Sequence, residues 1–146
     1  MHLSSHFTLQ ELTTSQIARR NGIDNTPTPE ILLHLKRTAL GLEAVRIRLG
    51  APVIVSSGYR CQALERALKR KPPTWTSASA HTDGDAADFI CPGFGSPSTV
   101  VSALMEAGIA FDQLIQEYGE WVHISFAPRM RGQVLRIDEQ GPHPFF

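Results

Sequence analysis

Little cysteine, no excess charge of either sign and no long apolar run set the first limits on this chain. Its 146 residues include two cysteines, Cys61 and Cys91. Two are too few for the disulfide framework of a small secreted domain, and they lack the Cys-x-x-Cys spacing of a thiolate zinc site. We therefore expect both to be free thiols.

Charge and hydropathy also limit the partners. The 14 basic residues equal the 14 acidic residues, so no net field attracts nucleic acid or an anionic membrane. No apolar run approaches the roughly 18 residues of a membrane span, and residues 1–6 lack the basic and apolar regions of a signal peptide. We expect no nucleic-acid partner, no membrane insertion and a protein that is cytoplasmic as synthesised.

The first 50 residues carry clear helix signals. The length fits one domain, residues 1–146, because domains typically have about 100 to 200 residues. A capping box at Thr8 and Glu11 predicts a helix that ends near Gly22. An N-cap at Thr28, followed by proline and apolar residues at helical spacing, predicts a helix of about 20 residues that stops at Gly50. This second helix is expected to be the spine of the core.

The remaining chain alternates strand and helix patterns. Strands are predicted at 53–57, 86–90, 111–116 and 121–126, with a hairpin at 117–120. Helices are predicted at 62–71, where the pattern is that of an exposed helix, and at 96–108. The tail, 131–146, is expected to add one edge strand at 134–137, with His143 as a mobile tail residue. The order predicts an α+β domain whose antiparallel sheet carries the site.

Residues 79–89 combine a histidine, a glycine turn and an aspartate at short spacing. A turn at Gly84 brings His81 and Asp88 together. Imidazole and carboxylate suit zinc, but a catalytic zinc needs three protein ligands and an open position. His123 is the best third candidate, because period-2 alternation places Trp121 and His123 on one face of a predicted strand. We predict one zinc ion on His81, Asp88 and His123.

These residues form a known pattern. Ser-x-His-x-x-Gly-x-Ala-x-Asp runs from Ser79 to Asp88, Ser-Gly-Tyr-Arg ends at Arg60, and Trp-x-His ends at His123. In this order, and with the opening at residues 6–12, they resemble the zinc D-Ala-D-Ala carboxypeptidase family, which includes D,D-dipeptidases and phage L-alanyl-D-glutamate endolysins. The resemblance covers the chain to about Phe126. It implies a zinc metallopeptidase that cleaves an amide in the peptide stem of peptidoglycan.

Three further residues are candidates for substrate contact. Arg60 is either a surface ion-pair partner or a fixed cation beside the metal that holds a substrate carboxylate or the developing oxyanion. The resemblance implies the second role. Ser79 either caps its turn or contacts the substrate's terminal carboxylate, as its position in the family implies. Trp121 is expected to bind substrate, whereas Trp75 is left open between a substrate platform and a cap on the core.

Amide hydrolysis also needs a general base, and two glutamates precede His123. Glu120 stands three residues before it, the spacing of the dipeptidase branch. Glu117 stands six residues before it and ends the Phe-Asp-Gln-Leu-Ile-x-Glu pattern of the branch that this chain most resembles. We predict that Glu117 is the base and that Glu120 is a solvated turn residue.

Several other polar residues are interpreted as structural. His34 fits no ligand pattern and is expected at the surface or in packing. Asp83 and Asp85, in a glycine turn, are expected to make local hydrogen bonds to their own turn. Asp112 is expected to be structural. Glu65 stands where the family more often has asparagine, and residues 70–78 replace a short glycine-rich approach with a loop that borders the cleft.

The function has alternatives from other classes. One is a zinc-bearing binding module without activity, as in hedgehog signalling domains, and another is a metal-free structural domain of a phage particle. Within the enzyme hypothesis, cleavage at D-Ala-D-Ala or at L-Ala-D-Glu stays open, because the two bonds differ in the pocket they need. We expect a monomer, released to the cell wall by phage lysis if the setting is a phage.

Overall fold

A six-stranded sheet in the order β1-β2-β4-β3-β5-β6 organises the chain. The computed structural model describes residues 1–146. All strand pairs are antiparallel except β3 and β5, which are parallel. The strands are β1 (Ile54–Ser57), β2 (Ala86–Ile90), β3 (Gln113–Glu117), β4 (Trp121–Ser125), β5 (Gln133–Asp138) and β6 (Gly141–Pro144). The predicted α+β class is confirmed. The sheet was predicted to be antiparallel, and it is mostly so, with the β3–β5 pair as the exception.

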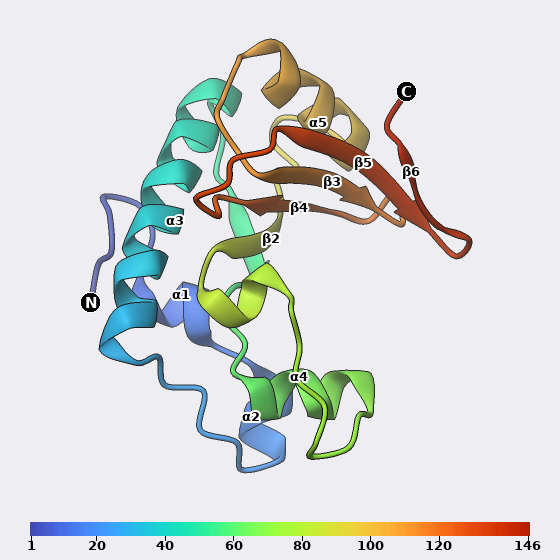
Figure 1. The fold of residues 1–146 in the computed structure, drawn as a ribbon. Helices are drawn as coiled ribbons and strands as arrows, with labels where there is room; N and C mark the ends of the chain where they lie inside the picture. Colours follow the sequence, from blue (N-terminus) through green and yellow to red (C-terminus); the bar gives the residue numbers. More distant parts are fainter.

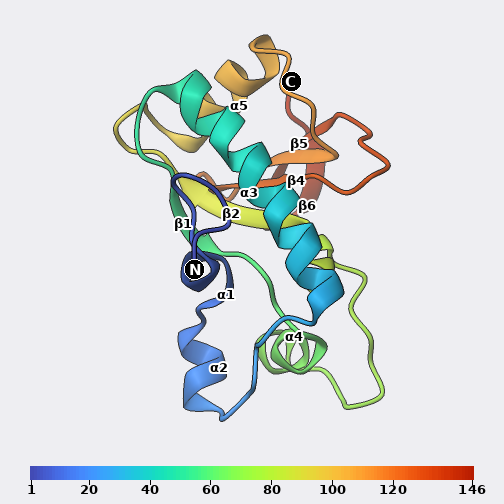
Figure 2. The same cartoon turned by 90° about the vertical axis from the view of Figure 1, so that its left-hand side faces the viewer.

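Helices cover one face of this sheet and one end of it. They are α1 (Leu9–Thr13), α2 (Gln16–Arg20), α3 (Pro29–Leu49), α4 (Gln62–Lys69), the 3-10 helix η1 (Ala80–Asp83) and α5 (Pro97–Glu106). In Figure 2, α3 crosses in front of the sheet, with α5 beside its upper end. Figure 1 shows α1, α2 and α4 grouped below the sheet. The opposite face of the sheet is therefore free to carry polar groups.

The two faces of the strands differ as period-2 alternation requires. Phe89, Leu114, Val122 and Ile124 turn toward α3 and α5 and belong to one core of 21 buried residues. Their neighbours at odd offsets, among them Asp88 and His123, turn to the other face. Strands β2 and β4 therefore carry the polar site on one face and contribute to the apolar core with the other.

Helix α3 is the long central helix of the core that the sequence predicted. Thr28 caps it by accepting a hydrogen bond from Ile31 N, and Gly50 ends it in the left-handed conformation with φ of 64°. Gly41 lets this helix approach the strand layer closely, because a Cβ there would overlap the ring of Phe126. The helix and the sheet are therefore in direct contact near the end of β4.

The first predicted helix is wrong as a single element. The capping box between Thr8 and Glu11 is present, but α1 ends at Thr13, and Ser15 caps a second helix by accepting from Ala18 N. Between them Thr14 is extended, with φ −70° and ψ 132°. A second cap inside the predicted span stops the first helix, since serine competes for the backbone there.

The tail also departs from the prediction. It adds two strands, of which β5 lies inside the sheet beside β3 and β6 forms an edge. His143 is not a mobile tail residue, because it lies in β6 and its Nε2 is 2.9 Å from Asp138 Oδ1. Asp112 holds the loop that connects β4 to β5. It accepts hydrogen bonds from Arg129 Nε and from three nitrogens of Arg131 at 2.9 to 3.0 Å.

Cys61 and Cys91 are free thiols. None of the helices combines the length and the apolar character that a bilayer span requires.

Candidate metal centre and active site

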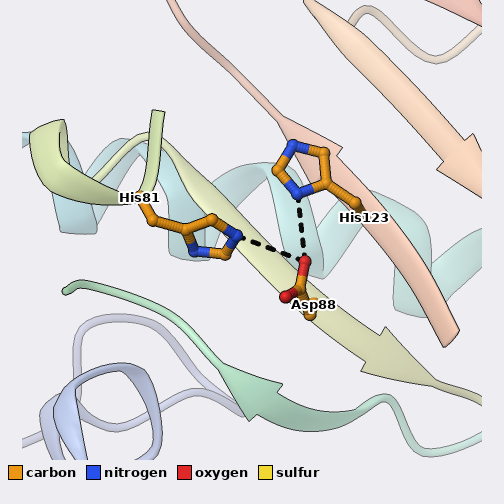
Figure 3. Close-up of side chains that lie close together, drawn as sticks. All are labelled: His81, Asp88 and His123. Carbon is orange, nitrogen blue, oxygen red and sulfur yellow. Dashed lines mark hydrogen bonds and ion pairs between the residues drawn. The ribbon is translucent and has the colours of Figure 1, made fainter. Parts of the chain in front are cut away.

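Three segments far apart in sequence meet at the polar face of the sheet. His81 lies in η1, Asp88 in β2 and His123 in β4. Asp88 and His123 are direct partners in the register of β2 and β4. The 3-10 turn ends at Gly84, with φ of 76°, and turns the chain from His81 into β2. Figure 3 shows both imidazole rings directed at the same carboxylate.

The geometry of the three side chains suits one metal ion. Asp88 Oδ1 is 3.3 Å from His81 Nε2 and 3.0 Å from His123 Nδ1. One ligand atom from each residue lies within 4.8 Å of the other two, and all three residues are buried. Two imidazole nitrogens and one carboxylate oxygen form a donor set that fits a catalytic zinc, which takes three protein ligands. The structure thus brings together the three predicted ligands.

Hydrogen bonding fixes how His81 faces this centre. Its Nδ1 is 2.7 Å from the carbonyl oxygen of Gly58, so Nδ1 carries the proton and Nε2 is left as the ligand atom. Gly58 is needed there, because a Cβ at this position would overlap the backbone of Leu12. The conformation of the Ser-Gly-Tyr-Arg segment therefore sets the orientation of a candidate metal ligand.

The site favours an ionised Asp88 carboxylate beside a neutral His81 imidazole. Burial alone raises the pKa of Asp88, but its polar contacts with His123 and His81 outweigh burial and hold the pKa well below its usual range. Burial lowers the pKa of His81, although Asp88 opposes this. A neutral imidazole and a carboxylate anion are the protonation states that bind a divalent ion.

Glu117 lies at the rim of the metal centre. Its Oε1 is 4.0 Å from His123 Nδ1, and its Oε2 accepts a hydrogen bond from Trp121 Nε1 at 2.9 Å. Burial and the charge of Asp88 raise its pKa, which makes it a better proton acceptor than an exposed carboxylate. Glu120 is exposed in the β3–β4 turn, where its backbone N–H donates to Glu117 O.

Arg60 also lies beside the metal ligands. Its Nη1 is 3.9 Å from Asp88 Oδ2 and donates to Ser57 Oγ at 2.9 Å. The guanidinium is mostly buried, so the surface ion-pair interpretation does not describe it. Its Nε is 3.1 Å from Oε2 of Glu65, a residue in α4.

Sequence reasoning missed Glu65. The predicted exposed helix at 62–71 is amphipathic instead, with Leu64 and Glu65 buried. Burial raises the pKa of Glu65, but hydrogen bonds from Ser77 and Lys69 and the charges of Arg60 and Lys69 outweigh it, so that the pKa is lowered. The one sequence signal for its role is that glutamate stands where the family more often has asparagine.

The predicted cap at Ser79 is present, since its Oγ accepts from His81 N at 3.2 Å. The predicted contact of Ser79 with substrate stays a prediction, as does that of Trp121. Trp75 lies outside the hydrophobic core. Its ring lies under the ammonium groups of Lys69 and Lys71, 5.8 and 5.6 Å away.

The local interpretation of Asp85 is wrong. Its carboxylate forms an ion pair with Arg37 of α3 and lies 3.8 Å from His34 Nδ1, so it binds a neighbouring helix and not its own turn. His34 Nδ1 also contacts the carbonyl oxygen of Asp83 at 2.7 Å. These contacts fasten η1 to α3 and keep the turn that carries His81 in place. Neither His34 nor Asp112 joins the metal cluster.

A cavity of about 550 Å³ opens on the Arg60 side of the centre. It lies between the α1–α2 connection and β1, and its polar lining includes Ser15, Ser57 and Arg60. A second hollow, of about 700 Å³, lies at the hairpin end of the sheet and includes Trp121 and Glu120. The first adjoins the metal ligands through Arg60, whereas the second touches the site only through Trp121.

A His-Asp-His cluster, a rim carboxylate and a mostly buried arginine are groups that a metallopeptidase site could use. The model of the Peptidase M15 family matches residues 5–125, most of the chain. The protein therefore belongs to this family, the zinc D-Ala-D-Ala carboxypeptidase family, and is a metallopeptidase. No curated protein sequence matches the chain.

Proposed function

We propose that the protein is a zinc metallopeptidase that hydrolyses an amide bond in peptidoglycan stem peptides, with His81, Asp88 and His123 holding one zinc ion. The observation that carries the proposal is the rim position of Glu117, 4.0 Å from His123 in a centre of three buried ligands. A binding module would need the ligands but not a carboxylate with a raised pKa beside them.

When bound, zinc supplies a Lewis acid for the scissile carbonyl and lowers the pKa of the attacking water. Glu117 takes the proton from that water at Oε1, while Trp121 holds Oε2. Glu117 then delivers the proton to the leaving amine nitrogen. Trp121 thus orients the base, and its ring borders the position of the substrate.

Arg60 provides positive charge on the other side of the centre. Its side chain lies beside Asp88 and lines the polar cavity of about 550 Å³. A guanidinium there stabilises the developing oxyanion or holds a carboxylate of the substrate. Ser79, at the start of η1, contributes a hydroxyl to the substrate's terminal carboxylate. All these groups come from one chain, so we expect the monomer to be active.

The test uses purified protein and cell-wall sacculi. Zinc content is measured first, and release of new amino groups is then followed with and without a chelator. Stoichiometric zinc with chelator-sensitive release supports the proposal, and the new end groups identify the bond as D-Ala-D-Ala or L-Ala-D-Glu. Stoichiometric zinc without any release would instead support a zinc-bearing binding module.

A further inference from the structure

We propose that Glu65 is a positioning residue that fixes the Arg60 guanidinium relative to Ser79 and so shapes the substrate-binding side of the centre. The expected kinetic effect rests on the proposed function, whereas the contacts that Glu65 makes with Arg60 and Ser77 can be tested without catalysis. Glu65 contacts neither the metal ligands nor the cavity beside Arg60.

The contact between Glu65 and Arg60 is isolated from solvent. Glu65 is 0% exposed, and its Oε2 lies 3.1 Å from Arg60 Nε. Both atoms are buried, and neither has a hydrogen-bond partner, because the pair is not aligned for one. Each charged atom therefore depends on the other for compensation, since an unpaired buried charge is costly.

This contact limits how the guanidinium can turn. Nε lies in contact with Glu65 Oε2, and Nη1 donates to Ser57 Oγ. Because the guanidinium is planar, two fixed nitrogens determine the direction of the third, Nη2. Nη1 is also the nitrogen near Asp88. The arginine is thus held with one nitrogen toward the metal ligands and one nitrogen left for a substrate oxygen.

The second oxygen of Glu65 binds the loop that precedes His81. Oε1 accepts from Ser77 Oγ at 2.7 Å and from Lys69 Nζ at 3.0 Å. Ser77 Oγ in turn accepts from the backbone N–H of Ser79 at 3.1 Å. One carboxylate therefore joins Arg60 to the segment that carries Ser79, the two residues proposed to bind the substrate.

The kinetic test is a double-mutant cycle on the zinc-loaded protein with a stem-peptide substrate. Glu65→Gln keeps the size and an acceptor for Ser77 but removes the charge, and we expect kcat/KM to fall about 10- to 100-fold, as for other residues that orient a site. In an Arg60→Lys background the same change should cost less than about threefold. Equal losses in both backgrounds would show a merely structural Glu65 and overturn the proposal.

Two variants act as matched controls. Ser77→Ala removes the link to Ser79 and keeps the ion pair, so kcat/KM should fall less than with Glu65→Gln. Lys69→Met removes the exposed partner of Oε1 and should change kcat/KM less than about threefold. If Lys69→Met lowered kcat/KM as much as Glu65→Gln does, the main role of Glu65 would be to balance the charge of Lys69, and the proposal would be overturned.

A measurement without catalysis separates this inference from the proposed function. The Arg60 Nε–H resonance, assigned by its disappearance in Arg60→Lys, should exchange slowly with solvent because this atom is buried against Glu65. Glu65→Gln should shift the resonance and speed its exchange, whereas Ser77→Ala should leave it in place. An unchanged resonance in Glu65→Gln refutes the positioning role, even if the protein proves inactive on every peptide.

Discussion

Trp121 donates its indole N–H to Glu117 Oε2 at 2.9 Å, across the hairpin that joins β3 and β4. The two residues are direct partners in the strand register, so the indole and the carboxylate project on the same face. The other oxygen, Oε1, is the one near His123. This contact gives the rim carboxylate a defined orientation toward the metal centre.

Replacing this donor should alter the pH profile. The hydrogen bond from Trp121 lowers the pKa of Glu117, against burial and Asp88, which raise it. Trp121→Phe removes that hydrogen bond and keeps an aromatic ring at this position, so the pKa of Glu117 should rise further. A base works only when it is deprotonated, and the acidic limb of kcat/KM should therefore move to higher pH. Stem-peptide hydrolysis across pH measures the limb; a shift to lower pH would contradict this role for Trp121.

The glutamates can be separated by isosteric changes. Glu117→Gln should reduce turnover about 10²- to 10⁴-fold and leave zinc content intact, because a general base does not hold the metal. Glu120→Gln should cost less than about tenfold, since its side chain lies in an exposed turn. Turnover is measured at saturating substrate on zinc-loaded protein. The reverse pattern would move the base to Glu120, and two active variants would favour the binding module.

The metal ligands should act as a unit. His81→Ala and His123→Ala should each lose stoichiometric zinc and activity together, because two remaining ligands do not hold a catalytic zinc. His34→Ala and His143→Ala are the controls and should keep both, since these histidines lie outside the cluster. Metal analysis after dialysis and the peptidase assay check this. A fully metallated, active His123→Ala protein would end the assignment.

Gly58 should matter for metal affinity without contacting metal. Gly58→Ala introduces a Cβ against the backbone of Leu12, which cannot move as a flexible side chain can. The carbonyl oxygen that binds His81 Nδ1 must then shift. We expect zinc affinity to fall about 10- to 100-fold and stability by about 1 to 3 kcal/mol. Gly22→Ala is the control, because no atom lies within 4 Å of the added Cβ there and its φ of +63° adds backbone strain without any overlap. It should retain wild-type zinc affinity in a competition titration.

Asp112 should stabilise the fold in a pH-dependent way. Hydrogen bonds from Arg131 and Arg129 outweigh the burial of Asp112, which raises its pKa, and keep that pKa well below the usual range. A lowered folded-state pKa means that its stabilisation is present above the unfolded value of about 3.9 and is lost as the pH falls toward the folded value. Asp112→Ala should cost about 2 kcal/mol at pH 7, a modest figure because both arginines are exposed. Urea unfolding at pH 7 and pH 3 should show the smaller loss at pH 3.

The local chemistry of the sequence determined most of the elements. Thr28 and Gly50 mark the ends of α3 because caps and left-handed turns depend on nearby residues alone. Strand β2 occupies the predicted 86–90, and the predicted hairpin joins β3 and β4. The break between α1 and α2 also has a local cause, the N-cap at Ser15, although the pattern from Thr8 to Gly22 predicts a single helix.

The metal ligands could be named from spacing, whereas their support could not. His81, Asp88 and His123 stand in a pattern that the chain displays directly. The buried contact between Glu65 and Arg60, and that between Asp85 and Arg37, join segments that only folding brings together. A charged residue on an amphipathic helix has no local sign that it faces inward, because burial depends on what packs above it.

The end of the sheet was decided by tertiary structure for the same reason. The pattern of residues 134–137 indicates a strand but does not indicate which strand it pairs with. Asp112 binds Arg129 and Arg131 and so leads the chain across to β3, which makes β5 parallel and internal. Sequence determined most of the extended segments, although not β6, and the three candidate metal ligands. The three-dimensional contacts of buried charges decided how those segments are ordered and how the site is held.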